Sequence, residues 1–342
     1  MKPLMIRSDA SPEIGTGHIM RCLALAEAWQ DTGGEVVFIL AYDTPAMEAR
    51  LKKEGFRILH ISQKSGTIGD ADETALIAHE HGADWIVVDG YHFGAEYQKT
   101  IKDAGLCLLF IDDYGHANHY FADIVLNQNI YADMSFYQHY EPYTRFLLGM
   151  KYVLLRKEFL QWSGWHRDIP EAARKILVTL GGSDPDNVTL KITEAVKTVD
   201  LDGLEVVVVV GGTNLHFDLI HETVKDLSNF TLIKNAENMP ELMAWADIAI
   251  TAGGSTCWEL AFMGVPCIII TLAENQKLIS KHISQKISCI NLGSYEEISI
   301  EKLYNAIYLL LSSFEKRLEI SQKAQRLVDG EGANLIVKII LT

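Results

Sequence analysis

Short apolar segments and amphipathic segments alternate along most of the chain, and this alternation limits the possible fold more than any other feature. Apolar runs typical of buried strands include Val36–Leu40 and Trp85–Asp89, and helix-like segments such as Pro45–Lys53 and Ala95–Asp103 follow them. Alternation of this kind predicts a parallel sheet that is covered by helices on both faces. We therefore expect an α/β protein whose ligands bind where the strands end.

The pattern occurs twice, with an irregular stretch between the two runs. The first run ends with a short predicted strand at Ile124–Leu126, the periodicity is lost from about 127 to 172, and a second run begins at Lys175. After the predicted strand Cys267–Thr271 we expect only helices. The predicted organisation is a first domain over 1–150, a connection over 151–173, a second domain over 174–314, and C-terminal helices over 315–342 that can cross back to the first domain.

The composition is that of a globular protein and argues against several kinds of partner. The 342 residues suffice for about two domains, and 48% of them are hydrophobic. A net charge of −15 argues against nucleic acid or an anionic membrane as a partner. No apolar run reaches the roughly 18 residues of a spanning helix, and no secretory leader follows Lys2. The five scattered cysteines are typical of reduced thiols, so we expect a cytoplasmic protein.

The stretch from residue 7 to 21 contains more polar residues than a turn between a strand and a helix requires. It includes Asp9, Gly15, Gly17, His18 and Arg21. Glycine lets the backbone turn sharply and approach a ligand, and the start of a helix presents unpaired N–H groups to negative charge. An imidazole can gain or lose a proton near neutral pH. We therefore expect a phosphate or oxyanion site with His18 beside it.

A simpler interpretation of this stretch is a common βα turn with a capping or surface histidine. The dinucleotide fingerprint G-x-G-x-x-G is not complete, because Met20 occupies its third glycine position. The concentration of polar residues favours a functional site over a plain turn.

Polar residues also follow the later predicted strands of the first domain. Asp89 and Tyr91 follow one strand, Asp112 and Asp113 the next, and residues 127–129 (Asn-Gln-Asn) the last. Because these strand ends converge on one edge of the sheet, we expect a polar pocket, although an acidic pair can also be a helix cap or a solvated turn. His116 and His119 lie nearby, but their spacing fits no familiar metal motif, so we expect surface histidines and no metal site.

The second domain repeats the sequence of strand, glycine turn and helix. It does so at Gly181-Gly182-Ser183 and again at Gly211-Gly212. Backbone N–H groups in such turns can surround a phosphate, and each turn can equally be a tight connection. Two such turns in one domain favour a diphosphate as the ligand.

The strongest motif of the second domain is Gly253-Gly254-Ser255-Thr256, with Glu259 one turn into the following helix. The helix start can take an anion, and a carboxylate can accept two hydroxyl hydrogen bonds. Ser255 could simply cap the helix, but this would not explain Glu259 in an otherwise apolar helix. Cys257 replaces the last glycine of G-x-S-x-G, and the chain has no G-K-[ST] phosphate loop, so neither a serine hydrolase nor a P-loop is expected.

Together these motifs resemble nucleotide-sugar enzymes of the GT-B architecture, in the manner of MurG-type N-acetylglucosaminyl transferases. The segment 7–23, with Asp89-Gly-Tyr91, Asp112-Asp113, Asn127-x-Asn129 and Gly181-Gly-Ser-Asp184, is closer still to the UDP-2,4-diacetamido-2,4,6-trideoxy-β-L-altropyranose hydrolases of pseudaminic acid synthesis and to the related SpsG-like proteins. This resemblance covers most of the chain. It implies two doubly wound Rossmann-like domains that face a cleft.

The resemblance implies that water attacks the anomeric carbon of a UDP-linked diacetamido sugar and releases UDP and the free sugar with inversion. His18 would match the general base and Tyr91 its partner, with Asp9 in a supporting catalytic position. No metal and no cofactor would be required. The expected substrate-binding residues are Gly15, Gly17, Arg21, Asp89, Asp113, Gly181, Gly182, Ser183, Gly212, Asn235, Met239, Ser255, Thr256, Glu259, Asn275 and Gln276. Among these, the loop from Asn235 to Met239 is the predicted location of the uracil.

Two other functions remain open from the sequence. The first is a GT-B glycosyltransferase that moves the sugar of a UDP-sugar to an acceptor. The second is a non-catalytic protein that binds a sugar nucleotide. The stereochemistry of the sugar and the oligomeric state do not follow from the sequence.

Overall fold

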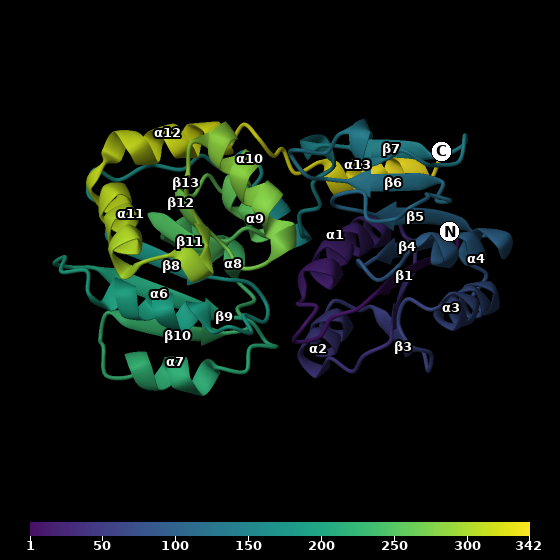
Figure 1. Cartoon of the computed structure of the whole chain (residues 1–342), viewed down its shortest axis with the longest axis horizontal. Helices are drawn as coiled ribbons and strands as arrows, with labels where there is room; N and C mark the ends of the chain where they lie inside the picture. The colour runs from purple at the N-terminus through teal and green to yellow at the C-terminus, as the bar shows by residue number, and fades with distance from the viewer. The chain divides into compact units, whose positions relative to one another are not determined.

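The computed structural model describes all residues from 1 to 342 and divides into two compact units. Unit 1 comprises residues 1–157 together with 331–342, and unit 2 comprises residues 158–330. Each unit is built around one fully parallel sheet with helices on both faces (Figure 1). The predicted α/β class with two doubly wound domains is therefore confirmed. The predicted cleft between the domains stays a prediction.

Unit 1 contains a seven-stranded sheet in the order β3-β2-β1-β4-β5-β6-β7. Its strands are β1 (Leu4–Ser8), β2 (Val36–Leu40), β3 (Arg57–His60), β4 (Trp85–Asp89), β5 (Cys107–Ile111), β6 (Ile124–Asn127) and β7 (Arg145–Leu148). Its helices are α1 (Gly17–Asp31), α2 (Pro45–Lys53), α3 (Ile68–Glu80), α4 (Ala95–Asp103) and α13 (Gly332–Ile340), with short 3₁₀ turns η1 (Met134–Phe136) and η2 (Met150–Tyr152). The sequence did not predict β7, which lies in the stretch that we expected to be irregular.

Two separate cores cover the two faces of this sheet, and successive side chains of a strand point alternately into one and the other. In β1, Leu4 and Ile6 belong to the core that includes residues of α1 and α13, whereas Met5 belongs to the core that includes residues of α3 and α4. All three side chains are fully buried. A strand that is covered on both faces is typically a continuous apolar run, as Leu4–Ile6 is here.

Unit 2 contains a six-stranded sheet in the order β10-β9-β8-β11-β12-β13. Its strands are β8 (Lys175–Thr179), β9 (Glu205–Val210), β10 (Phe230–Lys234), β11 (Ile248–Ala252), β12 (Cys267–Thr271) and β13 (Ile290–Ser294). Its helices are α6 (Val188–Lys197), α7 (Phe217–Val224), α8 (Met239–Trp245), α9 (Thr256–Phe262), α10 (Lys277–Ile287), α11 (Ile300–Ser312) and α12 (Phe314–Ala324), with 3₁₀ turns η3 (Glu274–Gln276) and η4 (Tyr295–Glu297); α5 (Lys157–Leu160) spans the boundary between the units in the sequence. The expectation of helices only after residue 271 is wrong, because β13 adds an edge strand next to β12.

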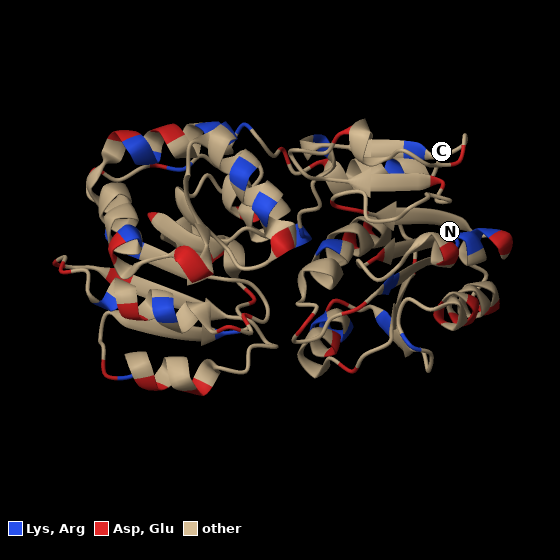
Figure 2. Cartoon of the chain, viewed as in Figure 1, with Lys and Arg blue, Asp and Glu red and all other residues tan.

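Charged residues lie mainly on the helices and loops, and the ribbons of the central strands are largely free of them (Figure 2). Strand β9, with the sequence Glu-Val-Val-Val-Val-Val, is typical: only its first residue is charged, and only that residue is exposed. The interior of each sheet is therefore largely apolar, and we look for polar functional residues at the ends of the strands. No helix has both the length and the apolar character that a membrane crossing needs.

The end of the chain returns to unit 1, and Figure 1 shows α13, in yellow, among the elements of that unit. Gly332, the first residue of α13, packs so closely on the backbone of the 3₁₀ turn η2 and the residue after it that a Cβ there would lie 2.2 Å from the carbonyl oxygen of Val153. Residues 315–330 stay in unit 2, where buried Arg317 of α12 donates to the carbonyl oxygens of Leu310 and Pro170. Only the last twelve residues of the predicted C-terminal segment cross back.

Candidate active site

The polar residues of unit 1 meet at the point where the order of its strands reverses. β1 and β4 are neighbours, but the chain continues from β1 toward one edge of the sheet and from β4 toward the other. The connections at the carboxyl ends of two such strands diverge and leave a crevice, which is where ligands bind in doubly wound sheets. The loop after β1 leads to His18, and β4 ends at Asp89. This topology brings the two residues together although they are far apart in the sequence.

The loop before α1 is closed on itself. Ser11 and Gly15 form an isolated antiparallel bridge, in which the Gly15 N–H donates to the Ser11 carbonyl oxygen at 2.8 Å. Gly15 has φ of +79°, a conformation that glycine adopts without strain. Gly17 differs, because its φ is ordinary and a Cβ there would meet no atom within 4 Å. The fold therefore explains the glycine at 15 but leaves open space at 17, directly before His18.

His18 is held by the carboxylate of Asp89. Its Nδ1 lies 2.7 Å from Asp89 Oδ1, and both residues are buried. Burial alone would raise the pKa of Asp89, but the charges of Arg21 and His18 and their hydrogen bonds hold it far below its ordinary value. An ionised carboxylate can only accept, so we assign the proton to Nδ1. The other contact of this nitrogen, with Arg21 Nη2, is longer, at 3.3 Å. In the neutral imidazole, Nε2 then has the free lone pair.

Arg21 lies one turn after His18 on α1 and binds two carboxylates. Its Nε and Nη2 both donate to Asp89 at 2.6 Å, and its Nη1 donates to Asp113 Oδ1 at 2.8 Å. Burial would lower the pKa of Arg21, but the charges of Asp113 and Asp89 raise it well above its ordinary value. The guanidinium therefore stays charged, and the planar two-bond contact fixes the Asp89 carboxylate beside His18.

Asp113 connects this group to Tyr91. The Tyr91 hydroxyl donates to Asp113 Oδ2 at 2.7 Å, and the Asn129 side-chain amide donates to Asp113 Oδ1 at 2.7 Å. The rings of His18 and Tyr91 meet edge to face with their centroids 4.7 Å apart. The strand ends of β4, β5 and β6 thus supply one connected network behind the imidazole.

Asp9 lies in a different cluster from His18. It accepts a hydrogen bond from the Ala41 N–H at 2.7 Å and from the Ser65 hydroxyl at 2.5 Å, and it forms an ion pair with Arg7 at 2.8 Å. Arg7 also binds Asp70 with two hydrogen bonds, at 2.9 and 2.8 Å. These contacts tie the loop after β1 to the loops after β2 and β3, so Asp9 anchors the backbone, and Asp89 orients the imidazole.

The two adjacent acids after β5 have separate tasks. Asp112 Oδ1 accepts the N–H groups of residues 113, 114 and 115 at 2.5, 3.0 and 3.1 Å, whereas Asp113 belongs to the network of Arg21. His116 is half-buried, with Nδ1 3.1 Å from Asp112 and Nε2 3.1 Å from the carbonyl oxygen of Phe93. Burial would lower the pKa of His116, but its contact with Asp112 raises it. His119 pairs with Glu141 at 3.0 Å, so both histidines are engaged by protein groups.

Sequence reasoning named Arg21, Asp89 and Asp113 as groups that contact the substrate. The structure shows them buried and bonded to one another. Asn129 was noticed as part of a motif but was not assigned to the site, and the structure places it in the network. Its position after a buried strand, like that of Asp89 and Asp113, is the signal that could have identified it.

In unit 2 the order of the strands reverses between β8 and β11, and the predicted glycine turns follow these strands and β9. Gly181 has φ of +96°, and a Cβ at Gly211 would lie 2.2 Å from the Gly182 carbonyl oxygen, which also accepts the Thr213 hydroxyl at 2.7 Å. The turns that contain Gly182 and Gly212 therefore pack against each other. Asp184 caps α6 through the N–H groups of residues 188 and 189, at 2.9 and 2.7 Å.

The motif at the start of α9 has polar side chains that are partly exposed, at the end of β11. Ser255 is the N-cap residue, yet its side chain makes no capping hydrogen bond, so capping does not explain the serine. Ser255, Thr256 and Glu259 are all half-buried and lie within the first turn of the helix. A Cβ at Gly254 would meet no atom within 4 Å, whereas at Gly253 it would lie 2.1 Å from Ser280 Oγ. Gly253 is thus needed for packing, and the space beside Gly254 is open.

The remaining predicted residues of unit 2 lie on the loops after β10 and β12. Asn235 is exposed with φ of +53°, and Met239 is buried at the start of α8. Gln276 uses its side-chain oxygen to accept the Leu272 N–H at 2.9 Å, which fixes the turn after β12. Ser183 and Asn275 are half-buried. The side chain of Gln276 therefore stabilises this turn, and it makes no capping hydrogen bond to α10.

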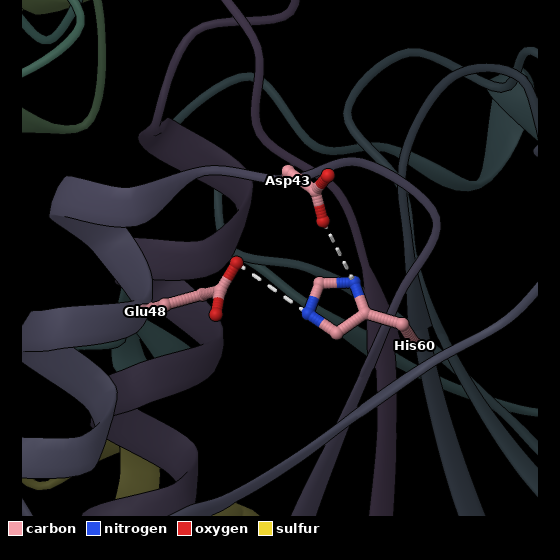
Figure 3. Close-up of side chains that lie close together, drawn as sticks. All are labelled: Asp43, Glu48 and His60. Atoms are coloured by element: carbon pink, nitrogen blue, oxygen red, sulfur yellow. Dashed lines mark ion pairs between the residues drawn. The ribbon is translucent and has the colours of Figure 1, made fainter.

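One further cluster of possible metal ligands lies away from these residues, at Asp43, Glu48 and His60 (Figure 3). The imidazole lies between the two carboxylates, with Nδ1 3.6 Å from Asp43 and Nε2 3.4 Å from Glu48. Glu48 also pairs with Lys52 at 3.1 Å, and the Asp43 side chain is 92% exposed. Each ring nitrogen thus faces a different carboxylate, which is the arrangement of a surface ion-pair network.

Comparison with known proteins identifies relatives over nearly the whole chain. Residues 176–336 match the model of the glycosyltransferase family 28 C-terminal domain. The spore coat polysaccharide biosynthesis protein SpsG of Bacillus subtilis is 28% identical over 98% of this chain and 96% of its own length. The UDP-2,4-diacetamido-2,4,6-trideoxy-beta-L-altropyranose hydrolase of Campylobacter jejuni is 25% identical over 83% of this chain and 96% of its own. The chain is a homologue of these two proteins.

Comparison of structures gives the fold class of this chain. The crystal structure of Acinetobacter baumannii MurG aligns over 100% of this chain and 99% of its own, with a TM-score of 0.67 and 17% sequence identity. The fold is therefore GT-B, and the resemblance that the sequence motifs indicated is confirmed.

Because Arg21 neutralises two buried carboxylates, we expect its replacement by Met to destabilise unit 1 strongly. Removing one partner of a buried ion pair typically costs about 3–5 kcal/mol, and Asp89 and Asp113 would both lose their cation. Urea unfolding at pH 7 of Arg21→Met measures this loss. Lys99→Met is the control, because it breaks an exposed ion pair with Asp103 and should change the stability little. Equal stability of the two variants would contradict the role of Arg21 as the cation that neutralises Asp89 and Asp113.

Proposed function

We propose that the chain hydrolyses a UDP-linked 2,4-diacetamido-2,4,6-trideoxy sugar at its anomeric carbon and releases UDP and the free sugar. The observation behind this proposal is the hydrogen bond between His18 Nδ1 and an Asp89 carboxylate that Arg21 keeps ionised. The hydrolase activity for which the Campylobacter relative is named supports the choice of substrate. The free sugar would then serve pseudaminic acid synthesis, as the family resemblance implies.

His18 is the proposed general base. With its proton on Nδ1, the imidazole can take a proton from water at Nε2, and Asp89 stabilises the imidazolium that forms. The oxygen of this water bonds to the anomeric carbon while the bond from that carbon to the diphosphate oxygen breaks. The electron pair of the broken bond leaves with UDP. A single displacement of this kind inverts the configuration at the anomeric carbon.

Tyr91 limits how the imidazole can rotate. Its ring packs edge to face on His18, and its hydroxyl is fixed by Asp113, which Asn129 and Arg21 hold in turn. A general base contributes about a hundred- to ten-thousand-fold to a rate only when it is positioned within reach of the proton. We therefore assign Arg21, Asp113 and Asn129 to positioning and His18 to proton transfer.

Unit 2 is the proposed nucleotide-binding unit. The hydroxyls of Ser255 and Thr256 would donate to the diphosphate, and the Glu259 carboxylate would accept hydrogen bonds from the two ribose hydroxyls. The Gly181–Ser183 and Gly212 turns would supply backbone N–H groups, and the loop from Asn235 to Met239 would contact uracil. Hydroxyl and backbone donors can stabilise the leaving diphosphate, so the proposed reaction uses no metal ion.

A glycosyltransferase reaction is the second candidate. The match of residues 176–336 to a glycosyltransferase C-terminal domain and the fold shared with MurG favour it. In that reaction His18 would take the proton of an acceptor hydroxyl in place of water. The two candidates differ in whether turnover needs an acceptor.

The proposed hydrolysis is tested by incubating the protein with the UDP-diacetamido sugar in ¹⁸O-labelled water without an acceptor. We expect release of UDP and incorporation of ¹⁸O at C1 of the free sugar. Turnover that appears only after an acceptor is added would contradict hydrolysis and support glycosyl transfer.

We expect His18→Ala to lower this turnover at least about a hundredfold, because the base is lost. Binding of UDP should change little, since His18 lies on unit 1. Steady-state kinetics and calorimetric titration with UDP measure the two effects. His119→Ala, a half-buried histidine on the same unit, is the control and should keep full turnover. Unchanged turnover in His18→Ala would remove His18 from the mechanism.

We expect Glu259→Gln to weaken UDP binding about tenfold, because a hydrogen bond to a charged group contributes more than one to a neutral group. The loss should be smaller for 2′-deoxy-UDP, which lacks one of the two hydroxyls. Calorimetric titration of both nucleotides measures this difference, with Glu241→Gln on α8 as the control. If Glu259→Gln binds both nucleotides as the unchanged protein does, Glu259 does not contact the ribose.

A further inference from the structure

The turn after β5 is fixed by an unusual number of contacts to one carboxylate. Asp112 Oδ1 accepts three successive backbone N–H groups and lies 3.1 Å from His116 Nδ1, and Asp112 Oδ2 accepts the hydroxyl of Tyr120. Gly115 has φ of +76°, and a Cβ there would lie 2.5 Å from the Phe136 carbonyl oxygen. These contacts hold the backbone of residues 112–116, from which the Tyr114 side chain extends.

Tyr114 is held on the protein by other rings and yet is exposed. Its centroid lies 5.3 Å from that of Tyr91 and 5.7 Å from that of His116, and 37% of its surface is accessible. His116 is fixed in turn by Asp112 and by the Phe93 carbonyl oxygen. Ring contacts in this distance range are favourable. The structure thus places an aromatic ring against other rings and leaves part of it accessible to solvent.

His18, Tyr91 and Tyr114 form a row of adjacent rings, which we call the aromatic row. The His18 and Tyr91 centroids are 4.7 Å apart, and Tyr91 then contacts Tyr114. The carboxylates that bind His18 and Tyr91, Asp89 and Asp113, are buried and share hydrogen bonds with Arg21. Asp112, which accepts the Tyr114 N–H, is buried as well. What unit 1 presents next to the imidazole is therefore ring surface, and such surface favours apolar groups of a ligand.

We propose that Tyr114, together with Tyr91, binds the apolar side of the sugar and sets the preference for a 6-deoxy, acetamido-substituted ring. This rests on the proposed function, in which His18 lies at the anomeric carbon. The C6 methyl and the acetamido methyls are the groups that lose water most favourably against the rings. A sugar with a hydroxyl at C6 would leave that hydroxyl against an apolar surface. Apolar pockets discriminate against an added hydroxyl by about a hundredfold at most.

Saturation-transfer NMR tests this proposal on the full chain with the UDP-diacetamido-trideoxy sugar. Irradiation of the aromatic protons should transfer saturation chiefly to the C6 and acetamido methyls. In Tyr114→Ala this transfer should fall severalfold, and kcat/KM for the trideoxy sugar should approach that for UDP-N-acetylglucosamine. Tyr114→Phe keeps the ring and should behave as the unchanged protein. Tyr308→Ala, which removes an exposed tyrosine of unit 2 that also rests on a second ring, is the control.

The possible outcomes separate this proposal from the proposed function. In one outcome the protein hydrolyses the sugar, and Tyr114→Ala shows the same saturation transfer to the methyls and the same ratio of kcat/KM values as the unchanged protein. This outcome overturns the role of Tyr114 and leaves the proposed reaction unaffected. Methyl contacts that depend on Tyr114, without hydrolysis by the unchanged protein, support the aromatic row and contradict the reaction. Absence of any binding of the UDP-sugar contradicts both.

Discussion

The contact between one guanidinium and two buried carboxylates determines the rest of the site in unit 1. Arg21 binds Asp89 through two hydrogen bonds and Asp113 through a third, and all three side chains are nearly inaccessible to water. Two carboxylates without a cation could not stay ionised at such positions. With Arg21 present, Asp89 stays ionised and can hold a proton on His18 Nδ1, and Asp113 can hold the hydroxyl of Tyr91. The ion pairs therefore fix the orientation of the His18 imidazole, as its proposed role as a base requires.

The doubly wound topology is what makes this contact possible. The residues involved come from α1 and from the ends of β4 and β5, which the chain reaches in separate crossovers. Because all strands are parallel, their carboxyl ends lie along one edge of the sheet, and the reversal of strand order between β1 and β4 opens space there. Unit 2 uses the same principle at β8 and β11, where glycine turns and the polar start of α9 meet. The packed apolar strands thus bring polar residues that are distant in the sequence to one edge of each sheet.

The sequence was most informative where a strand is buried on both faces. The alternating pattern predicted β2, β4 and β12, which are apolar apart from the last residue of β4 and of β12, whereas β7 and β13 were missed. Both missed strands lie at the edge of a sheet, and β13 contains a glycine and only partly buried side chains. The polar loop after β1 was also noticed in the sequence, which gave Asp9 a supporting position beside His18 and assigned Asp89 to the substrate. Which carboxylate faces the imidazole depends on strand order, and only the structure places Asp89 there and Asp9 beside Arg7.

The central claim of this account is that Asp89 fixes the proton of neutral His18 on Nδ1 and leaves Nε2 free to accept one. ¹⁵N NMR of the protein labelled at its histidines, with His18 assigned by comparison with His18→Ala, measures this tautomer directly. We predict a protonated Nδ1 and an unprotonated Nε2 for the neutral ring, with that preference weakened in Asp89→Asn. A neutral His18 that carries its proton on Nε2 in the unchanged protein would contradict the account.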